Sequence, residues 1–402
     1  MRNNTILIFI ALTAILLSCT KQNHKNMDRH PNQDSVAVPL TGPTAIAASS
    51  DDLFAIDDNT GTFRWHYSSN GYITPPAFGN GITYTSNLDT LRVIAIDDST
   101  GNIVWSLPMQ NEVDFTILYN GILYAGCNDE ILYAIDPLKG TIKWTFKGNN
   151  SWVCFGTYGD MVLASNGDNN LYALNALSGN LLWKYTAPSS EVVGSLANGN
   201  GLIYAGTFGY KLLALDPSTG VQKWSFDVGN KTIPEPLITD GVVYQRKSDN
   251  HLYALDAFSG STKWTFSYND SVFFYNSIAD AGSGTLFTCG SGTTLYALDL
   301  FSGVIKWKYS GSASYYVPPV LLNGVIYLAG NDSSLCSIDA ATGKLIWKFN
   351  AGDRVLADLT IKDGIIYFGC GDQKLYAVDA TSGILKWSFT TNSFINAPVF
   401  IY

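Results

Sequence analysis

The chain has 402 residues, of which 46% are hydrophobic and only 14% are charged, and its formal net charge at pH 7 is −9. The acidic balance and the lack of a clustered Lys/Arg footprint exclude nucleic acid and other polyanions as partners. The counts of 37 Gly, 23 Tyr, 20 Phe and 10 Trp indicate a β-protein with many turns, and argue against long amphipathic helices.

The N-terminus has the pattern of an export signal: Arg2 is positive, Ile6 to Leu17 is apolar, and Leu16-Leu17-Ser18-Cys19 provides a cleavage region. The apolar run is too short to span a bilayer as a permanent helix. Its end resembles the lipobox of bacterial lipoproteins, which implies that residues 1–18 are removed and that Cys19 carries the lipid. The alternative is an ordinary signal peptide with a chance cysteine.

Residues 19–37 are polar and are expected to form a flexible tether. No acidic run of the kind linked to surface export follows Cys19, which favours attachment to the outer membrane on the side facing the periplasm. Residues 38–402 are expected to form the folded body.

That body is dominated by one internal repeat. Nine copies place Ala, an apolar residue, Asp, turn residues, Gly and Trp in the same order, and successive Trp residues are 39 to 43 positions apart. In the last copy, Asp379 is placed to accept hydrogen bonds within its turn, and Gly383 to take the positive φ of a tight hairpin. The nine tryptophans are Trp65, Trp105, Trp144, Trp183, Trp224, Trp264, Trp307, Trp347 and Trp387.

Two further strands precede each Asp-to-Gly hairpin, as in Gly121–Ala125 and Pro318–Leu322. Four antiparallel strands in about 40 residues are typical of a blade of a β-propeller. The first copy begins near Thr44 without its first strand, and residues 396–402 are left over after the last copy. The sequence therefore predicts an all-β propeller of nine blades that is closed by its C-terminal strand; eight blades with one displaced repeat is the alternative.

The motif Ala-x-Asp-x-x-Thr-Gly-x-x-x-Trp resembles the repeat of the PQQ-binding-like β-propellers, also called quinoprotein-alcohol-dehydrogenase-like repeats, over residues 44–402. Copy four departs from it with Asn175 and copy eight with Ser337. The resemblance implies that the nine tryptophans dock between neighbouring blades. The family includes enzymes that hold pyrroloquinoline quinone (PQQ) over Ca²⁺, with a catalytic Asp and, in many, a disulfide between adjacent cysteines. It also includes non-enzymatic BamB-type lipoproteins of the outer-membrane β-barrel assembly machinery.

Three features favour the lipoprotein class: the chain has no Cys-Cys pair, its repeats lack long inserted loops, and it has the lipobox and tether. We therefore expect a non-enzymatic, lipid-anchored scaffold for protein–protein interaction at the cell envelope, with no catalytic residue, metal or cofactor. The alternatives are a PQQ- and Ca²⁺-dependent dehydrogenase, and a sensor of small ligands or glycans.

The residues that could hold a ligand have simpler interpretations. Asp57-Asp58-Asn59 and Asp97-Asp98-Ser99 lack the spacing of a calcium loop and are predicted to be structural turns. The histidines at positions 24, 30, 66 and 251 lack ligand spacing, and the cysteines at positions 127, 154, 289, 336 and 370 are predicted to be buried apolar side chains. Glu191, Glu235 and Asp358 are interpreted as solvated channel carboxylates, with a funnel ligand as the alternative.

A partner surface is predicted from differences among the repeats. The Asp-to-Gly turn and the Asn-Gly or Asp-Gly turn after the innermost strand are nearly constant and fall on one face, whereas the opposite face varies and is free to carry function. The predicted aromatic anchors on that opposite face are Trp152, Phe155, Phe273, Phe274, Tyr275, Tyr315, Tyr316 and Phe394. The predicted acidic rim is Asp129, Asp168, Asp249, Asp332 and Asp372. Aromatics inside a charged rim are typical of protein interfaces, but these side chains could instead plug the channel mouth.

Overall fold

The computed structural model describes residues 44–69, 71–188, 191–229, 236–268, 278–280, 284–289, 292–315, 317–391, 393–395 and 397–401. The chain divides into two units, Met1–Val36 and Ala37–Tyr402, and every described residue belongs to the second. The expected signal peptide, Cys19 and the tether lie outside the described residues. The described part of the chain contains no helix that is long and apolar enough to cross a membrane.

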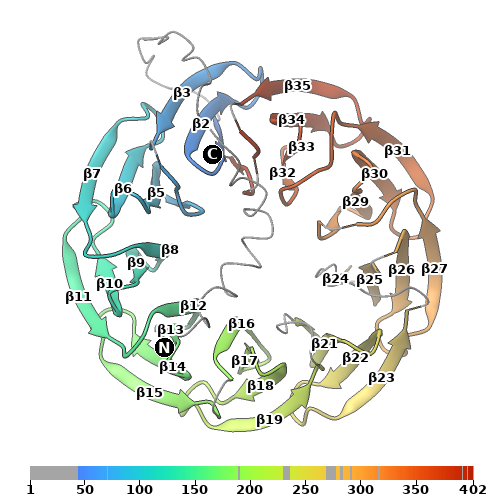
Figure 1. Cartoon of the computed structure of the whole chain (residues 1–402). Helices are drawn as coiled ribbons and strands as arrows, with labels where there is room; N and C mark the ends of the chain where they lie inside the picture. The colour runs from blue at the N-terminus through green and yellow to red at the C-terminus, as the bar shows by residue number, and fades with distance from the viewer. Residues whose placement is uncertain are drawn as a thin grey trace, which may run out of the picture. The chain divides into compact units, whose positions relative to one another are not determined.

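The second unit is a ring of nine four-stranded antiparallel sheets, which follow one another in chain order (Figure 1). The sheets confirm the predicted propeller of nine blades and exclude the eight-bladed alternative. We number the blades from the one that contains the first described strand. In blades 2 to 9 the first strand in chain order is the innermost and the fourth forms the outer edge, whereas in blade 1 the C-terminal strand is the innermost (Figure 1).

The strand bounds are as follows. Blade 1 contains β1 (Thr44–Ala48), β2 (Asp52–Asp57), β3 (Phe63–Ser68) and, as its innermost strand, β36 (Phe400–Ile401); blade 2 contains β4 (Ala77–Gly79), β5 (Ile82–Asn87), β6 (Arg92–Asp97) and β7 (Ile103–Pro108); blade 3 contains β8 (Val113–Tyr119), β9 (Ile122–Cys127), β10 (Ile131–Ile135) and β11 (Ile142–Lys147). Blade 4 contains β12 (Trp152–Tyr158), β13 (Met161–Asn166), β14 (Asn170–Asn175) and β15 (Leu181–Thr186); blade 5 contains β16 (Val193–Gly199), β17 (Leu202–Thr207), β18 (Lys211–Leu215) and β19 (Gln222–Asp227); blade 6 contains β20 (Leu237–Thr239), β21 (Val242–Lys247), β22 (His251–Asp256) and β23 (Thr262–Ser267). Blade 7 contains β24 (Ile278–Asp280), β25 (Thr285–Cys289), β26 (Thr294–Asp299) and β27 (Ile305–Ser310); blade 8 contains β28 (Val320–Leu322), β29 (Val325–Ala329), β30 (Ser334–Asp339) and β31 (Leu345–Asn350); blade 9 contains β32 (Thr360–Lys362), β33 (Ile365–Gly369), β34 (Lys374–Asp379) and β35 (Leu385–Thr390).

The Asp-to-Gly turn that joins the third and fourth strands explains part of the repeat. In blade 2, Asp97 Oδ1 accepts hydrogen bonds from the backbone N–H groups of Ser99 (3.0 Å) and Thr100 (2.8 Å). Gly101 closes the turn with a φ of 73°, and a Cβ atom at this position would lie 2.8 Å from ring carbons of Trp65 in blade 1. Only glycine therefore satisfies both the backbone conformation and the packing.

The tryptophan of each repeat explains a second part of the repeat, which is the contact with the next blade. Trp144 Nε1 of blade 3 donates a 3.1 Å hydrogen bond to the carbonyl of Ala176, the residue after the turn Asn175 of blade 4. The Tyr124 hydroxyl donates to the same carbonyl at 2.9 Å. The equivalent bond joins every pair of neighbouring blades: Trp65 to Asp98, Trp105 to Pro137, Trp183 to Pro217, Trp224 to Ala257, Trp264 to Leu300, Trp307 to Ala340, Trp347 to Ala380, and Trp387 to Asp58.

The two ends of the described chain meet in blade 1. β36 pairs with β1 through Ala45 opposite Ile401 and Ile46 opposite Phe400, so the prediction of closure by the C-terminal strand is confirmed. The Phe400 ring stacks on Phe78 of blade 2 with a centroid separation of 4.1 Å. Closure therefore covers the inner edge of β1 at these two positions.

Candidate functional site

The ring has two faces that the backbone distinguishes. The Asp–Gly face carries the nine Asp-to-Gly turns and the turns that follow the innermost strands; backbone bonds such as Asp98 N to Gly81 O, 3.0 Å, join these two kinds of turn. The variable face carries the turns between second and third strands and the segments that lead into the innermost strands. Thr44, the first described residue, pairs with Asp57 and so lies at the Asp–Gly face.

The predicted aromatic anchors do not form one surface. Trp152 is 3% exposed and Tyr315 is 2% exposed, and both pack inside blade clusters, so they are unavailable to a partner and that part of the prediction is corrected. Phe155 is half-buried against Phe115, with ring centroids 4.2 Å apart. Phe394 is 43% exposed. The other predicted anchors, Phe273, Phe274, Tyr275 and Tyr316, lie outside the described residues.

The predicted acidic rim has a structural explanation. Four of its members accept a hydrogen bond from the hydroxyl of a tyrosine four residues later: Asp129 from Tyr133, Asp168 from Tyr172, Asp249 from Tyr253 and Asp372 from Tyr376, at 2.6 to 2.8 Å. Asp332 instead lies 3.2 Å from Lys348 Nζ. The repeated Asp-x-x-x-Tyr spacing was readable in the sequence and indicates a turn clamp.

Two exposed aromatics that the sequence analysis missed lie on the variable face. Tyr72 is 46% exposed and Tyr210 is 37% exposed. The backbone N–H of Tyr72 donates to Asp89 Oδ2 at 2.9 Å, which fixes the segment that leads into β4. Tyr210 occupies the turn between β17 and β18 with a φ of 62°, a conformation that this turn requires.

Tyr72 and Phe394 flank the turn between β1 and β2. Ile73 N donates to Ser50 O at 2.8 Å, and Ser393 Oγ donates to Asp51 Oδ1 at 3.4 Å. One turn therefore contacts both segments that carry the exposed rings, and the carboxylates of Asp51 and Asp89 lie beside them. The arrangement is an aromatic pair with acidic neighbours.

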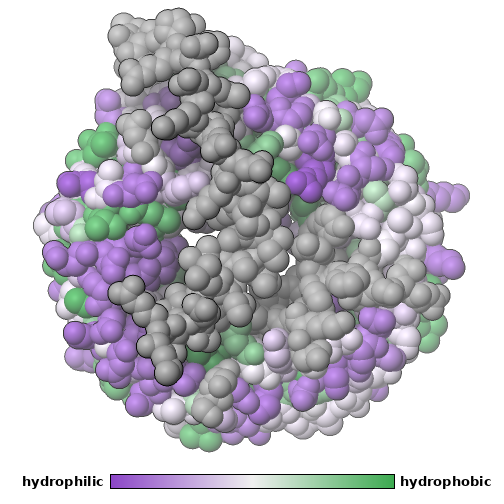
Figure 2. Space-filling view, in the orientation of Figure 1, coloured by the Kyte–Doolittle hydropathy of each residue, from purple (hydrophilic) through white to green (hydrophobic). Residues whose placement is uncertain are grey.

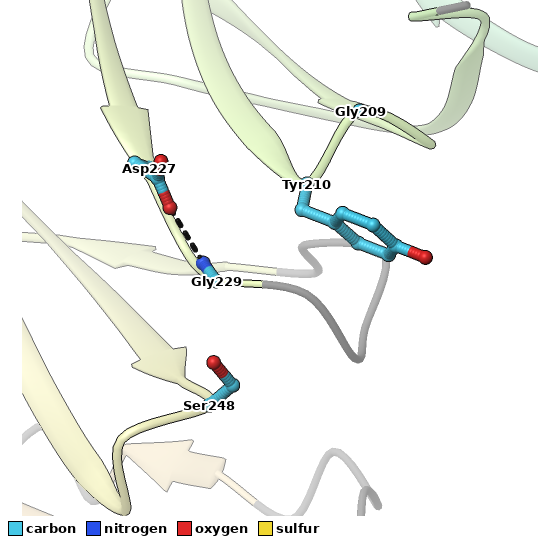
Figure 3. Close-up of a pocket in the computed structure, with 5 residues that line it drawn as sticks. All are labelled: Gly209, Tyr210, Asp227, Gly229 and Ser248. Atoms are coloured by element: carbon cyan, nitrogen blue, oxygen red, sulfur yellow. Dashed lines mark hydrogen bonds between the residues drawn. The ribbon is translucent and has the colours of Figure 1, made fainter.

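An open depression lies between blades 5 and 6 on the same face. It is lined by Gly209, Tyr210, Asp227, Gly229 and Ser248 (Figure 3). Asp227 Oδ1 accepts a 2.7 Å hydrogen bond from Gly229 N, and the Tyr210 ring projects away from the ribbon of its turn (Figure 3). Among the lining side chains only Asp227 is charged at neutral pH, so the depression offers no acid–base pair.

The predicted channel carboxylates are dispersed. Glu191 Oε1 lies 2.6 Å from Lys211 Nζ in an ion pair, Asp358 is exposed, and Glu235 lies outside the described residues. Both Asp358 and Asp114 keep exposed side-chain surface, but desolvation of the carboxyl group raises the pKa of Asp358. Desolvation also raises the pKa of Asp114 to about 6, against a hydrogen bond from Asn128. The described carboxylates of this set therefore do not form one site.

The side chains that could hold a metal ion are dispersed among the described residues, and many of them have partners within the fold. No group of three or more His, Cys, Asp or Glu side chains in the described ranges is placed to hold one metal ion. His66 pairs with Asp52 at 2.9 Å and His251 with Asp249 at 3.2 Å. The turn carboxylate Asp216 is held as an anion, because the Ser218 hydroxyl and then the Lys223 ammonium keep its pKa far below the usual value. All five described cysteines are free, and four of them are buried.

The Asp–Gly face carries exposed apolar side chains on five consecutive blades. We call them the apolar tips, and they are Leu138, Leu177, Val221, Phe258 and Phe301, with exposed fractions of 60%, 69%, 60%, 64% and 70%. Four of them follow the turn Asp or Asn by two positions, where the side chain points out of the turn. The sequence signal was an apolar residue at a turn position where the fold requires none. On the face shown in Figure 2, hydrophobic residues outside the grey region form separate small patches among hydrophilic ones.

Comparison with known proteins agrees with this geometry. The family model described as outer membrane protein assembly factor BamB matches residues 49–195, 167–315 and 313–399. No curated protein matches the chain. Among solved structures, the computationally designed protein Ika8 is 16% identical, with a TM-score of 0.58, and the match covers 79% of this chain and 96% of that one. BamB from Moraxella catarrhalis is 15% identical, with a TM-score of 0.54 and coverage of 86% and 98%.

A quinohemoprotein alcohol dehydrogenase from Pseudomonas putida is 14% identical, with a TM-score of 0.53 and coverage of 75% and 69%. At these identities the solved structures share the fold alone. The family model, in contrast, extends over nearly all of the described ring. The chain therefore belongs to the family described as outer membrane protein assembly factor BamB, within the PQQ-like β-propellers.

Proposed function

We propose that this protein is a non-enzymatic, lipid-anchored scaffold that faces the periplasm from the outer membrane and binds protein partners of the outer-membrane assembly machinery. The observation that carries the proposal is the exposed pair Tyr72 and Phe394 on the variable face, together with membership of the family. Exposed aromatic rings bury large apolar areas in a complex and are common anchors of protein interfaces.

The electrostatics of this surface indicate the chemistry of the partner. Asp51 and Asp89 lie beside the two rings, and the whole chain has a formal net charge of −9. Acidic neighbours around an apolar centre favour a partner with a basic rim, because complementary charges speed encounter and set the orientation. We therefore expect binding of the partner to weaken as the salt concentration rises.

The anchor is tested by Cys19→Ser. Because no described helix crosses a membrane, we expect this variant to be recovered as a soluble protein from the periplasm. The measurement is fractionation of cells into soluble and membrane pools, with washing in high salt to remove peripheral proteins. A variant that stays with the membranes after this washing would place the anchor elsewhere.

The partner surface is tested by the double variant Tyr72→Ser and Phe394→Ser. We expect it to lose protein partners in a pull-down from solubilised membranes, while its thermal unfolding stays that of the wild type. The matched control is Val104→Ser with Ile346→Ser, which removes two exposed apolar side chains from the outer strands β7 and β31. The proposal fails if the variable-face variant is folded and retains every wild-type partner.

A further inference from the structure

We infer that the Asp–Gly face is the membrane-facing side of the ring, and that the apolar tips of blades 3 to 7 dip into the lipid surface. This inference rests on the lipid-anchored part of the proposed function. It names lipid as a second contact of the folded body, separate from the lipid on Cys19.

The described chain begins at the Asp–Gly face. Thr44 lies at the Asp–Gly face, where it pairs with Asp57 and where its hydroxyl accepts a 2.8 Å hydrogen bond from Arg64. The segment between Cys19 and Thr44 is 24 residues, which reaches at most about 80 Å when fully extended. A ring held by such a segment meets the membrane most directly with the face at which the segment joins it.

Hydrogen bonds within the turns hold the apolar tips in place. Leu138, Leu177, Phe258 and Phe301 each donate a backbone N–H to the turn Asp or Asn two residues earlier, at 3.0 to 3.2 Å. These bonds fix the backbone below each side chain and hold it outward in water. The exposure is therefore built into the turns.

The distribution of the tips around the ring is uneven. The tip of blade 5, Val221, lies five residues after Asp216. At the position two residues after the turn Asp or Asn, blades 3, 4, 6 and 7 carry an apolar tip, whereas blades 5, 8, 1 and 2 have Ser218, Ala341, Asn59 and Ser99. Blade 9 has Thr381 there and an exposed Ile384 nearby. Ile384 is the counterpart of Val221, so the exposed apolar side chains run over blades 3 to 7 and occur again on blade 9. They would tilt the ring toward the bilayer on that side.

The separation of the tips distinguishes lipid from a protein partner. Each tip stands on a separate blade, and the turn Asp of the same blade forms an ion pair, such as Lys223 with Asp216 (3.0 Å) and Lys263 with Asp256 (3.1 Å). A protein would need a complementary pocket for each isolated side chain. A lipid interface adapts to separate insertions and also solvates lysine side chains, whose stems lie along apolar surface.

The test uses the full lipoprotein reconstituted in vesicles of phosphatidylethanolamine and phosphatidylglycerol, with no other protein present. An environment-sensitive fluorophore is attached to a single engineered cysteine, Leu177→Cys or Phe301→Cys. Matched controls are Ser99→Cys, at the equivalent turn position of blade 2, and Tyr210→Cys on the variable face. The parent protein is labelled in parallel, since its described native cysteines are free.

We expect the labels at positions 177 and 301 to shift their emission to shorter wavelength on vesicles and to be quenched by lipid-borne quenchers. The labels at positions 99 and 210 should keep the emission of an aqueous probe. Flotation of the vesicles shows separately whether the protein is anchored.

Protein that floats while the labels at 177 and 301 stay aqueous would overturn the inference and leave the anchor standing. Protein that does not float would overturn both. Labels that become protected only when membrane proteins are added would show a protein contact at this face, and would also overturn the inference.

Discussion

Blades 2 and 3 are neighbours built from the same repeat, yet they are stabilised differently. In blade 3 the innermost strand β8 has seven residues, and it pairs with a second strand whose side chains are all buried and almost all apolar. In blade 2 the innermost strand β4 has three residues and follows Pro75-Pro76. Proline has no N–H to give to a ladder, so pairing there is short.

Side chains replace the missing ladder in blade 2. Thr85 Oγ1 donates to Thr74 O at 2.8 Å, and Ser86 Oγ donates to Val113 O of blade 3 at 2.7 Å. Blade 2 also buries Asp98, whereas blade 3 has Pro137 at the same turn position. The comparison shows that the repeat determines the turn and the tryptophan clamp, and leaves the polarity of the blade interior free to vary.

The largest expected effect comes from the clamp that joins these two blades. Trp105→Ala removes a large ring and a 2.8 Å hydrogen bond to Pro137 O, and should lower the free energy of unfolding by about 3–5 kcal/mol. Hydrogen exchange should accelerate in both β5 and β9, because each blade packs on its neighbours. Phe301→Ala is the control, since its ring is 70% exposed. Wild-type unfolding of Trp105→Ala would show that the clamp is dispensable.

The next effect concerns the buried acid of blade 2. Burial raises the pKa of Asp98 from 3.8 to about 7, while the Thr83 hydroxyl, 2.5 Å away, opposes the shift. Because the folded pKa is raised, the folded state favours the protonated acid. Stability is therefore greatest below about pH 4 with respect to this group and falls as the pH rises to about 7.

The loss is on the order of 4 kcal/mol, and Asp98→Asn should remove it. Urea unfolding of the wild type and the variant at several pH values measures the difference. Pro137→Asp, which places an Asp at the equivalent position of blade 3, should give the protein a second loss of stability over the same pH range. If Asp98→Asn and the wild type lose stability in parallel across this pH range, Asp98 is not the responsible group.

The smallest effect compares two tyrosines at equivalent places. The Tyr124 hydroxyl of blade 3 donates to Ala176 O at 2.9 Å, whereas the buried Tyr84 hydroxyl of blade 2 has no hydrogen-bond partner. Tyr124→Phe should cost about 1 kcal/mol, and Tyr84→Phe should cost nothing or stabilise. Thermal unfolding of the two single variants checks this order. Equal losses would mean that Tyr84 gains a partner in solution.

These neighbouring blades also show how far the sequence leads. The order of Asp, Gly and Trp predicts the hairpin, the blade count and the closure, because each of these residues acts within its own turn or at a fixed place in the next blade. It does not predict that Asp98 is buried while Asp97 holds the turn, since both carboxylates stand next to each other in the sequence.

The surface was harder to predict for a similar reason. Trp152 leads into an innermost strand and was expected to be exposed, but the register shift between Trp152 and Cys154 accompanies a side chain that is turned into the blade interface. Such shifts leave no trace in the alternation of residues. Phe258 and Phe301, in contrast, were readable as apolar residues in turns that need only polar ones.

The closure of blade 1 sets an order of events for synthesis. The strand β1, near the start of the ring, pairs with Phe400 and Ile401 near the C-terminus. Nearly the whole chain must therefore be synthesised before the ring is complete. Until then β1 presents an open edge that another strand could join. A chain that stops short of residue 400 would carry this edge permanently.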